Sequence, residues 1–134
     1  VIDLLPNQNL ENDDIGASMR LGTYPCKIKK GTLTSKIYND EVIYERHRHR
    51  YEVNNKYKDK LEKAGLVISG MSPDNNLIEM IEVKGHPYFV ASQFHPEFKS
   101  RPWEPAPMFM NFIEAASKLD IIKKNNNETL KVKD

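Results

Sequence analysis

The chain has 134 residues, which is enough for one small domain with its own hydrophobic core. Its 20 lysines and arginines nearly balance its 19 aspartates and glutamates, so a formal net charge of +1 gives no reason to expect nucleic acid or an anionic membrane as a partner. No apolar run approaches the ~20 residues of a membrane-spanning helix, and no signal-peptide pattern opens the chain.

The first part of the chain is predicted to contain a loop, a strand and a short helix. Residues 6–18 are rich in Asn, Asp, Glu and Gly, which is typical of a mobile loop. Residues 19–29 predict a strand with a break at Pro25. Thr32 is suited to be the N-cap of a short helix that ends at Tyr38.

A second strand and a second helix follow. Val42-Ile43-Tyr44 predicts a strand that enters a run rich in arginine and histidine. Asn54 or Asn55 can cap a helix that continues through Ala64, and Gly65 is suited to the position after its end.

The second half of the chain predicts three strands in quick succession, over residues 66–70, 77–83 and 88–94. The segments between them are turns that contain Pro, Asp, Asn and Gly. Such a β-meander could pack as an antiparallel extension of a parallel sheet.

A helix and a polar tail end the chain. Residues 108–119 carry apolar side chains at helical spacing and predict an amphipathic helix. The segment from Lys123 to Asp134 is polar and Asn-rich, which is typical of disorder. We therefore expect one domain portion over residues 1–122 and a disordered tail over residues 123–134.

The strand predicted over residues 88–94 leads into a His-x-Glu pair. Residues i and i+2 of an extended chain point to the same face, so the Glu97 carboxylate can lie beside the His95 ring and hold it in one tautomer. Pro96 lacks an N–H and ends the strand, and ligands of open α/β sheets bind at the carboxyl ends of strands. The pair is a candidate catalytic base with its orienting carboxylate, although an isolated His-Pro-Glu is more often a surface turn.

The run Arg46-His47-Arg48-His49-Arg50 allows three functional interpretations. It is short for a nucleic-acid patch. A metal site could use both histidines, but the flanking guanidiniums would repel a cation and no third ligand is evident. A carboxylate clamp suits the arginines, because a guanidinium forms a bidentate fork with a carboxylate. From the residues alone, the default is a solvated strand with the three arginines on one face and the two histidines on the other.

The single thiol, Cys26, is a poor candidate for a nucleophile. It lies between Pro25 and Lys27 in a strand-like stretch, whereas an elbow nucleophile occupies a tight turn with small neighbours. Nearby lysines could lower its pKa, but a semi-buried structural cysteine is the expectation. One cysteine cannot form an internal disulfide, so a reducing cytoplasm is the expected location.

Longer strings resemble a known family. Gln93-Phe94-His95-Pro96-Glu97-Phe98 resembles the C-terminal catalytic motif of class I, triad-type glutamine amidotransferases. Its extension through Pro102 narrows the resemblance to the CTP synthase family. The run from Glu45 to Asn54 resembles the same family at the same distance upstream, and Met19-Arg20-Leu21-Gly22 is a third match. The resemblance covers the chain from Ser18 to Ser117.

The resemblance implies an α/β fold of the flavodoxin- or Rossmann-like kind, a mostly parallel sheet flanked by helices, of which this chain is expected to hold the C-terminal part. It implies that His95 is the catalytic base, that Glu97 orients it, and that Arg50 contacts the substrate glutamine. Tyr51 is a candidate for lining the glutamine pocket, with a core position as the alternative. The family's nucleophile lies in a Gly-Cys-Leu-Gly-type turn that this sequence lacks, so we expect the chain to be inactive by itself.

One segment departs from the family pattern. Ile15-Gly16-Ala17-Ser18 stands where the family usually has Gly-Gly-Thr, which leaves the role of this loop's backbone open.

The implied reaction is the hydrolysis of L-glutamine, with the ammonia passing to a synthase domain that aminates ATP-activated UTP to CTP. ATP and Mg²⁺ are implied for that domain, GTP as activator and a tetramer as the assembled enzyme, whereas this chain is expected to hold no cofactor or metal. The expected partners are the upstream half of the amidotransferase domain and the synthase domain.

Two alternatives to this function stay open. One is a non-catalytic amidotransferase-like binding module, and the other is a γ-glutamyl peptide hydrolase with the same triad. The extension Phe98-Lys99-Ser100-Arg101-Pro102 and the arginine- and histidine-rich run argue against the hydrolase.

Overall fold

The computed structural model describes residues 1–4 and 19–131, with side chains described as far as residue 120. The loop expected over residues 6–18 lies outside the described residues. The elements in chain order are β1 (Ile2–Leu4), β2 (Arg20–Ile28), α1 (Leu33–Tyr38), β3 (Val42–His49), β4 (Tyr51–Val53), η1 (Asn55–Tyr57), α2 (Lys58–Lys63), β5 (Leu66–Met71), β6 (Ile78–Val83), β7 (Val90–Ser92), η2 (Pro96–Phe98) and α3 (Pro107–Lys131).

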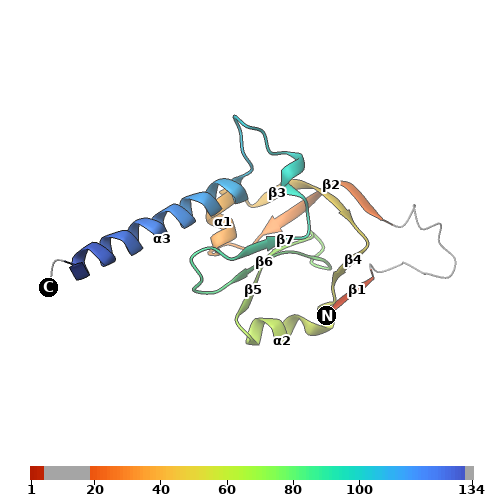
Figure 1. Cartoon of the computed structure of the whole chain (residues 1–134). Helices are drawn as coiled ribbons and strands as arrows, with labels where there is room; N and C mark the ends of the chain where they lie inside the picture. Colours follow the sequence, from red (N-terminus) through yellow and green to blue (C-terminus); the bar gives the residue numbers. More distant parts are fainter. Residues whose placement is uncertain (5–18, 132–134) are drawn as a thin grey trace.

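Five strands form one sheet in the order β3-β2-β5-β6-β7, and β1 pairs with β4 in a separate two-stranded sheet (Figure 1). Every strand pair among the described residues is antiparallel, so these residues do not form the mostly parallel sheet that was expected. The predicted meander of β5, β6 and β7 is confirmed, with β7 shorter than expected. The turns that join these three strands are too short for a parallel crossover, which needs a dozen or more residues.

The chain after β7 reaches back to the far edge of the sheet. The backbone N–H of Gln93 donates to the Glu79 carbonyl on β6 (2.8 Å), and the backbone N–H of His95 donates to the Arg46 carbonyl on β3 (2.8 Å). The end of β7 thus lies between β6 and β3, and the sheet curls around its core. The buried core cluster consists of Cys26, Ile28, Ile37, Ile43, Met80, Phe94 and Met108.

The two short helices begin where their caps predict. Thr32 caps α1 by accepting the Ser35 N–H (3.1 Å). Asn54 accepts the Lys56 N–H (2.9 Å), although the first turn after it is the 3₁₀ helix η1 rather than α-helix. Gly65 follows α2 with φ +97°, a conformation that suits glycine at a helix end.

Strand β2 is continuous through Pro25, so the predicted break is wrong. Pro25 lies opposite Tyr44 of β3, and on its other side β2 meets β5 only at Lys27 and Ile28. One side of β2 is therefore unpaired at Pro25, where a residue without an N–H breaks no ladder.

Helix α3 contains the predicted helix 108–119 and is longer than expected. Its backbone stays helical through Lys131, whereas the tail from Lys123 was expected to be disordered. No proline or glycine occurs between residues 108 and 131 to end it. In Figure 1 the helix points away from the sheet. Among the described helices, none combines the length and the apolar character needed to cross a membrane.

The backbone of Gly70 on β5 lies close against side chains of the core. A Cβ at this position would lie 2.7 Å from Cys26 Sγ and 3.0 Å from Cβ and Cγ of Met80. We expect Gly70→Ala to lower the free energy of unfolding by about 1–3 kcal/mol through overpacking. Urea denaturation measures this loss. Cys26→Ala in the same chain removes Sγ and should relieve part of the loss caused by Gly70→Ala. If the double variant loses as much free energy of unfolding as the two single variants together, the overpacking explanation is contradicted.

Candidate functional site

His95 and Glu97 lie together just after β7. The His95 Nδ1 and Glu97 Oε1 atoms are 2.7 Å apart. A carboxylate can only accept, so Nδ1 carries the proton and Nε2 keeps its lone pair for use as a base. The predicted pair is brought together, but by a different backbone: Pro96–Phe98 form the one-turn helix η2 instead of an extended chain.

Both side chains of the pair remain accessible, with 39% of His95 and 51% of Glu97 exposed. Desolvation acts to raise the pKa of the Glu97 carboxyl, but hydrogen bonds from its own backbone N–H and from His95 leave that pKa below its usual value. Glu97 is therefore an anion at neutral pH. It can hold the ring in one tautomer and stabilise the imidazolium that forms when Nε2 takes a proton.

Cys26 is fully buried in the core, as the sequence interpretation expected of a structural cysteine. Burial, with a smaller contribution from the Glu79 carboxylate, raises the pKa of the thiol to about 12. The thiol is therefore protonated at neutral pH, and a protonated thiol is a poor nucleophile.

Strand β3 separates the arginines from the histidines. Arg46 and Arg48 are exposed, while His47 is buried and His49 is half-buried on the opposite face, as predicted. Arg50 does not continue the exposed row, because β3 ends at His49 and Arg50 lies in the bend before β4. Arg50 is half-buried, and its Nε is a buried donor without a partner among the described residues.

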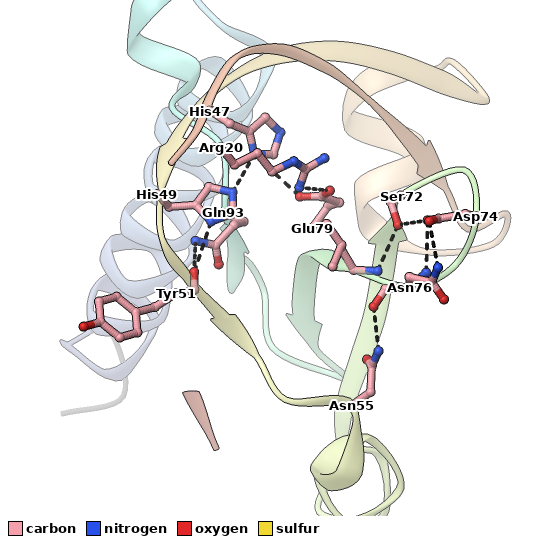
Figure 2. A network of polar contacts seen from close by, with 11 residues as sticks. Arg20, His47, His49, Tyr51, Asn55, Ser72, Asp74, Asn76, Glu79 and Gln93 are labelled. Atoms are coloured by element: carbon pink, nitrogen blue, oxygen red, sulfur yellow. Dashed lines mark hydrogen bonds and ion pairs between the residues drawn. The ribbon is translucent and has the colours of Figure 1, made fainter. Parts of the chain in front are cut away.

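A buried polar network lies behind the histidines, and the sequence analysis missed it (Figure 2). Arg20 Nη1 and Glu79 Oε1 form an ion pair at 2.5 Å, with 9% and 0% of the two side chains exposed. Glu79 Oε2 lies 3.7 Å from His47 Nδ1. The available signal was the two glutamates, Glu79 and Glu82, of the otherwise apolar strand β6.

The His49 imidazole and the Tyr51 carbonyl extend this network to β4. His47 Nδ1 lies 3.0 Å from His49 Nε2, and His49 Nδ1 lies 3.1 Å from the Tyr51 carbonyl oxygen. Gln93 Nε2 donates to the same oxygen (3.2 Å). The Tyr51–Glu52 peptide is therefore held against the strand end that leads to His95.

The network supplies the third ligand that the sequence did not show. His47, His49 and Glu79 each place a ligand atom within 4.8 Å of the others. However, the Arg20 guanidinium is already bonded to Glu79, so a positive charge stands beside the position that a cation would take. This arrangement suits a hydrogen-bonded network better than a cation site.

Both histidines of the network are neutral at neutral pH. Burial, helped by the nearby Arg20 charge, lowers the pKa of His47 to about 3. Burial is also the main cause that lowers the pKa of His49, although its hydrogen bond to Tyr51 acts in the other direction. Each ring therefore has one N–H to donate and one lone pair to accept with.

The candidate glutamine-binding residues lie at the same end of the sheet as His95. The Tyr51 carbonyl meets Gln93, two residues before His95, and the Arg46 carbonyl accepts from His95 itself. The Tyr51 ring is 54% exposed, so this side chain is not a core residue. Tyr51 contributes its backbone oxygen to the network, whereas its ring points away in Figure 2.

Comparison with known proteins identifies the family of this chain. The family model of class I glutamine amidotransferases matches residues 7–115. The chain is 58% identical over 128 residues to a CTP synthase of Caldanaerobacter subterraneus subsp. tengcongensis, covering 96% of this chain and 23% of that protein. It is 58% identical over 116 residues to a CTP synthase of Bacillus subtilis, covering 87% of this chain and 22% of that protein. The chain thus spans less than a quarter of the length of these curated relatives.

The fold also has a solved counterpart. The glutaminase domain of Trypanosoma brucei CTPS, solved with bound acivicin, superposes with a TM-score of 0.77 at 39% identity. The match covers 88% of this chain and 46% of that chain. Similar sequence and similar structure therefore point to the same group of proteins.

Proposed function

The chain belongs to the class I glutamine amidotransferase family, and from this premise we propose that it provides the base of a glutaminase site in a CTP synthase. The observation that carries the proposal is the 2.7 Å contact between His95 Nδ1 and Glu97 Oε1. It leaves Nε2 as an accessible base in a chain that is 58% identical to CTP synthases.

The proposed chemistry needs a thiolate from a segment that this chain does not contain. That thiolate attacks the carboxamide carbon of glutamine, and the protonated His95 gives its proton to the departing ammonia. His95 Nε2 then takes a proton from the water that hydrolyses the thioester, which yields glutamate and restores the thiolate. Glu97 stabilises the imidazolium in both steps.

Arg50 is the proposed contact for the α-carboxylate of glutamine. Its guanidinium is half-buried, and its Nε has no partner among the described residues, so a donor is available to a ligand. A bound carboxylate would satisfy that donor by the bidentate geometry that arginine favours. Tyr51, with its exposed ring next to Arg50, is the proposed lining of the same pocket.

The rest of the reaction belongs to other parts of the enzyme. We propose that the ammonia passes to a synthase domain, where ATP and Mg²⁺ would bind and UTP would be aminated, with GTP as activator of a tetramer in the cytoplasm.

The test of the proposal is complementation. We expect the chain alone to release no ammonia from glutamine, because its one thiol is buried and protonated. Adding the upstream half of the amidotransferase domain, with its Gly-Cys-Leu-Gly-type turn, should produce glutaminase activity that survives Cys26→Ser. Ammonia release measured with glutamate dehydrogenase gives the readout.

Two results would overturn parts of this proposal. Turnover by the isolated chain that disappears in Cys26→Ser would make Cys26 the nucleophile. No turnover from the two halves together, although they bind each other, would favour a non-catalytic binding module.

A further inference from the structure

The polar network forms a closed ring of contacts that begins and ends at Glu79. Its carboxylate bonds Arg20 and lies 3.7 Å from His47, and its backbone carbonyl accepts the Gln93 N–H (2.8 Å). From His47 the ring runs through His49 to the Tyr51 carbonyl, and Gln93 Nε2 closes it there. Figure 2 shows the Tyr51 oxygen with one donor from each side.

The donors and acceptors in this closed ring of contacts allow only one placement of the protons on the two histidines. The Tyr51 carbonyl can only accept, so His49 carries its proton on Nδ1 and has a lone pair on Nε2. His47 must then donate from Nδ1 to His49 Nε2, across 3.0 Å. Two neutral imidazoles with defined tautomers therefore link His47, which packs 3.7 Å from the Glu79 carboxylate, to the Tyr51 carbonyl.

Such a ring is costly to bury. Two charged and two polar side chains leave water, and His47 Nε2 and Glu79 Oε2 have no hydrogen-bond partner among the described residues. Apolar residues of similar size would fill this space with less loss of solvation. The hydrogen bonds of such a network, in return, specify the relative position of the groups they join, because each hydrogen bond forms only over a narrow range of geometry.

We propose that Arg20, Glu79, His47 and His49 are positioning residues that hold the Tyr51–Glu52 peptide, and with it the neighbouring Arg50, against the strand end carrying His95. This inference rests on the function proposed above, with Arg50 as the glutamine contact and His95 as the base. The closed ring of contacts connects Arg50 with His95. It holds Tyr51, which follows Arg50, and Gln93, which precedes His95 by two residues. Its effect is on how glutamine is held rather than on the chemical step.

The test replaces His49 in the full-length enzyme. His49→Phe keeps the ring shape and removes both hydrogen bonds, so we expect KM for glutamine to rise roughly 3- to 10-fold with a smaller change in kcat. Ammonia-dependent CTP formation should stay at the parent level. His49→Asn can still donate to the Tyr51 carbonyl and should recover part of the loss. Gln93→Leu removes the other donor and should raise KM in the same way.

Tyr88→Phe is the matched control. It removes a part-buried hydrogen bond, from Tyr88 to the Met108 carbonyl, that lies outside the ring. We expect this variant to lose stability without a change in KM for glutamine. If His49→Phe does not fold, Gln93→Leu and His49→Asn test the same junction from its two sides.

The possible outcomes separate this inference from the function on which it rests. If His95→Ala abolishes glutamine use but His49→Phe and Gln93→Leu leave KM unchanged, the positioning role is wrong and the glutaminase stands. If His95→Ala leaves glutamine use intact, the proposed function itself fails. Calorimetry tests for a cation site. If the chain binds zinc and His49→Phe does not, these residues form a cation site in place of the positioning network.

Discussion

His95→Ala in the full-length enzyme is expected to reduce glutamine-dependent CTP formation by roughly 10²–10⁴-fold, the usual contribution of a positioned general base. Its Nε2 lone pair is accessible, and its Nδ1 proton is held by Glu97 at 2.7 Å. Without the imidazole, neither ammonia departure nor water attack has a proton carrier. Ammonia-dependent CTP formation should survive, because the proposed synthase site is elsewhere.

Glu97→Gln is the companion variant and should cost less. It keeps the shape of the side chain and removes the charge that supports the imidazolium, and Glu97 is half exposed, so water replaces part of its effect. A charge-assisted contact shielded from water contributes about 1.5–3 kcal/mol, so the loss in kcat from this partly screened contact should stay below roughly 100-fold. If either variant abolished ammonia-dependent synthesis as well, the residue would have a structural role.

Arg50→Ala is expected to weaken glutamine use by roughly 10- to 100-fold in kcat/KM, the loss expected from a charge-assisted bidentate contact of about 1.5–3 kcal/mol. Arg50 is half-buried and precedes Tyr51, whose carbonyl the network holds, and its buried Nε has no hydrogen-bond partner among the described residues. Arg50→Lys should restore only part of the activity, because an ammonium cannot form the fork.

Arg48 provides the matched control for Arg50. It is exposed on the opposite face of β3 from the histidines, so Arg48→Ala should cost little. The comparison is glutamine-dependent against ammonia-dependent CTP formation for all three arginine variants. Equal losses on both nitrogen sources, or full recovery with lysine at position 50, would mean that Arg50 supports the fold or a neighbouring charge instead of the substrate.

Much of the local structure could be predicted from short stretches of sequence. Thr32 and Asn54 cap the helices that were predicted to follow them, and Gly65 ends the second one. The meander of β5, β6 and β7 was also predictable, because short turns between strands permit only antiparallel pairing. These features depend on residues that are close in the chain.

Expectations that depended on a strand's neighbours could not be settled from the sequence. Pro25 was expected to interrupt β2, but it lies where β2 has a partner on one side only. The class I amidotransferase fold implied by the family resemblance is confirmed, but the described residues contribute only antiparallel strand pairs to it. A single segment does not reveal how many partners a strand has or in which direction they run.

The sequence by itself determined the opposite faces of the arginines and histidines on β3, because alternate residues of a strand share a face. It also predicted that His95 and Glu97 lie together, although the helix η2 joins them in place of the expected extended chain. Only the tertiary structure decided what the histidines contact. Arg20 and Glu79 are 59 positions apart in the chain, and they meet beside His47 because the sheet curls until the end of β7 reaches β3. Curvature of that kind results from the packing of the whole core, so no local pattern predicts it.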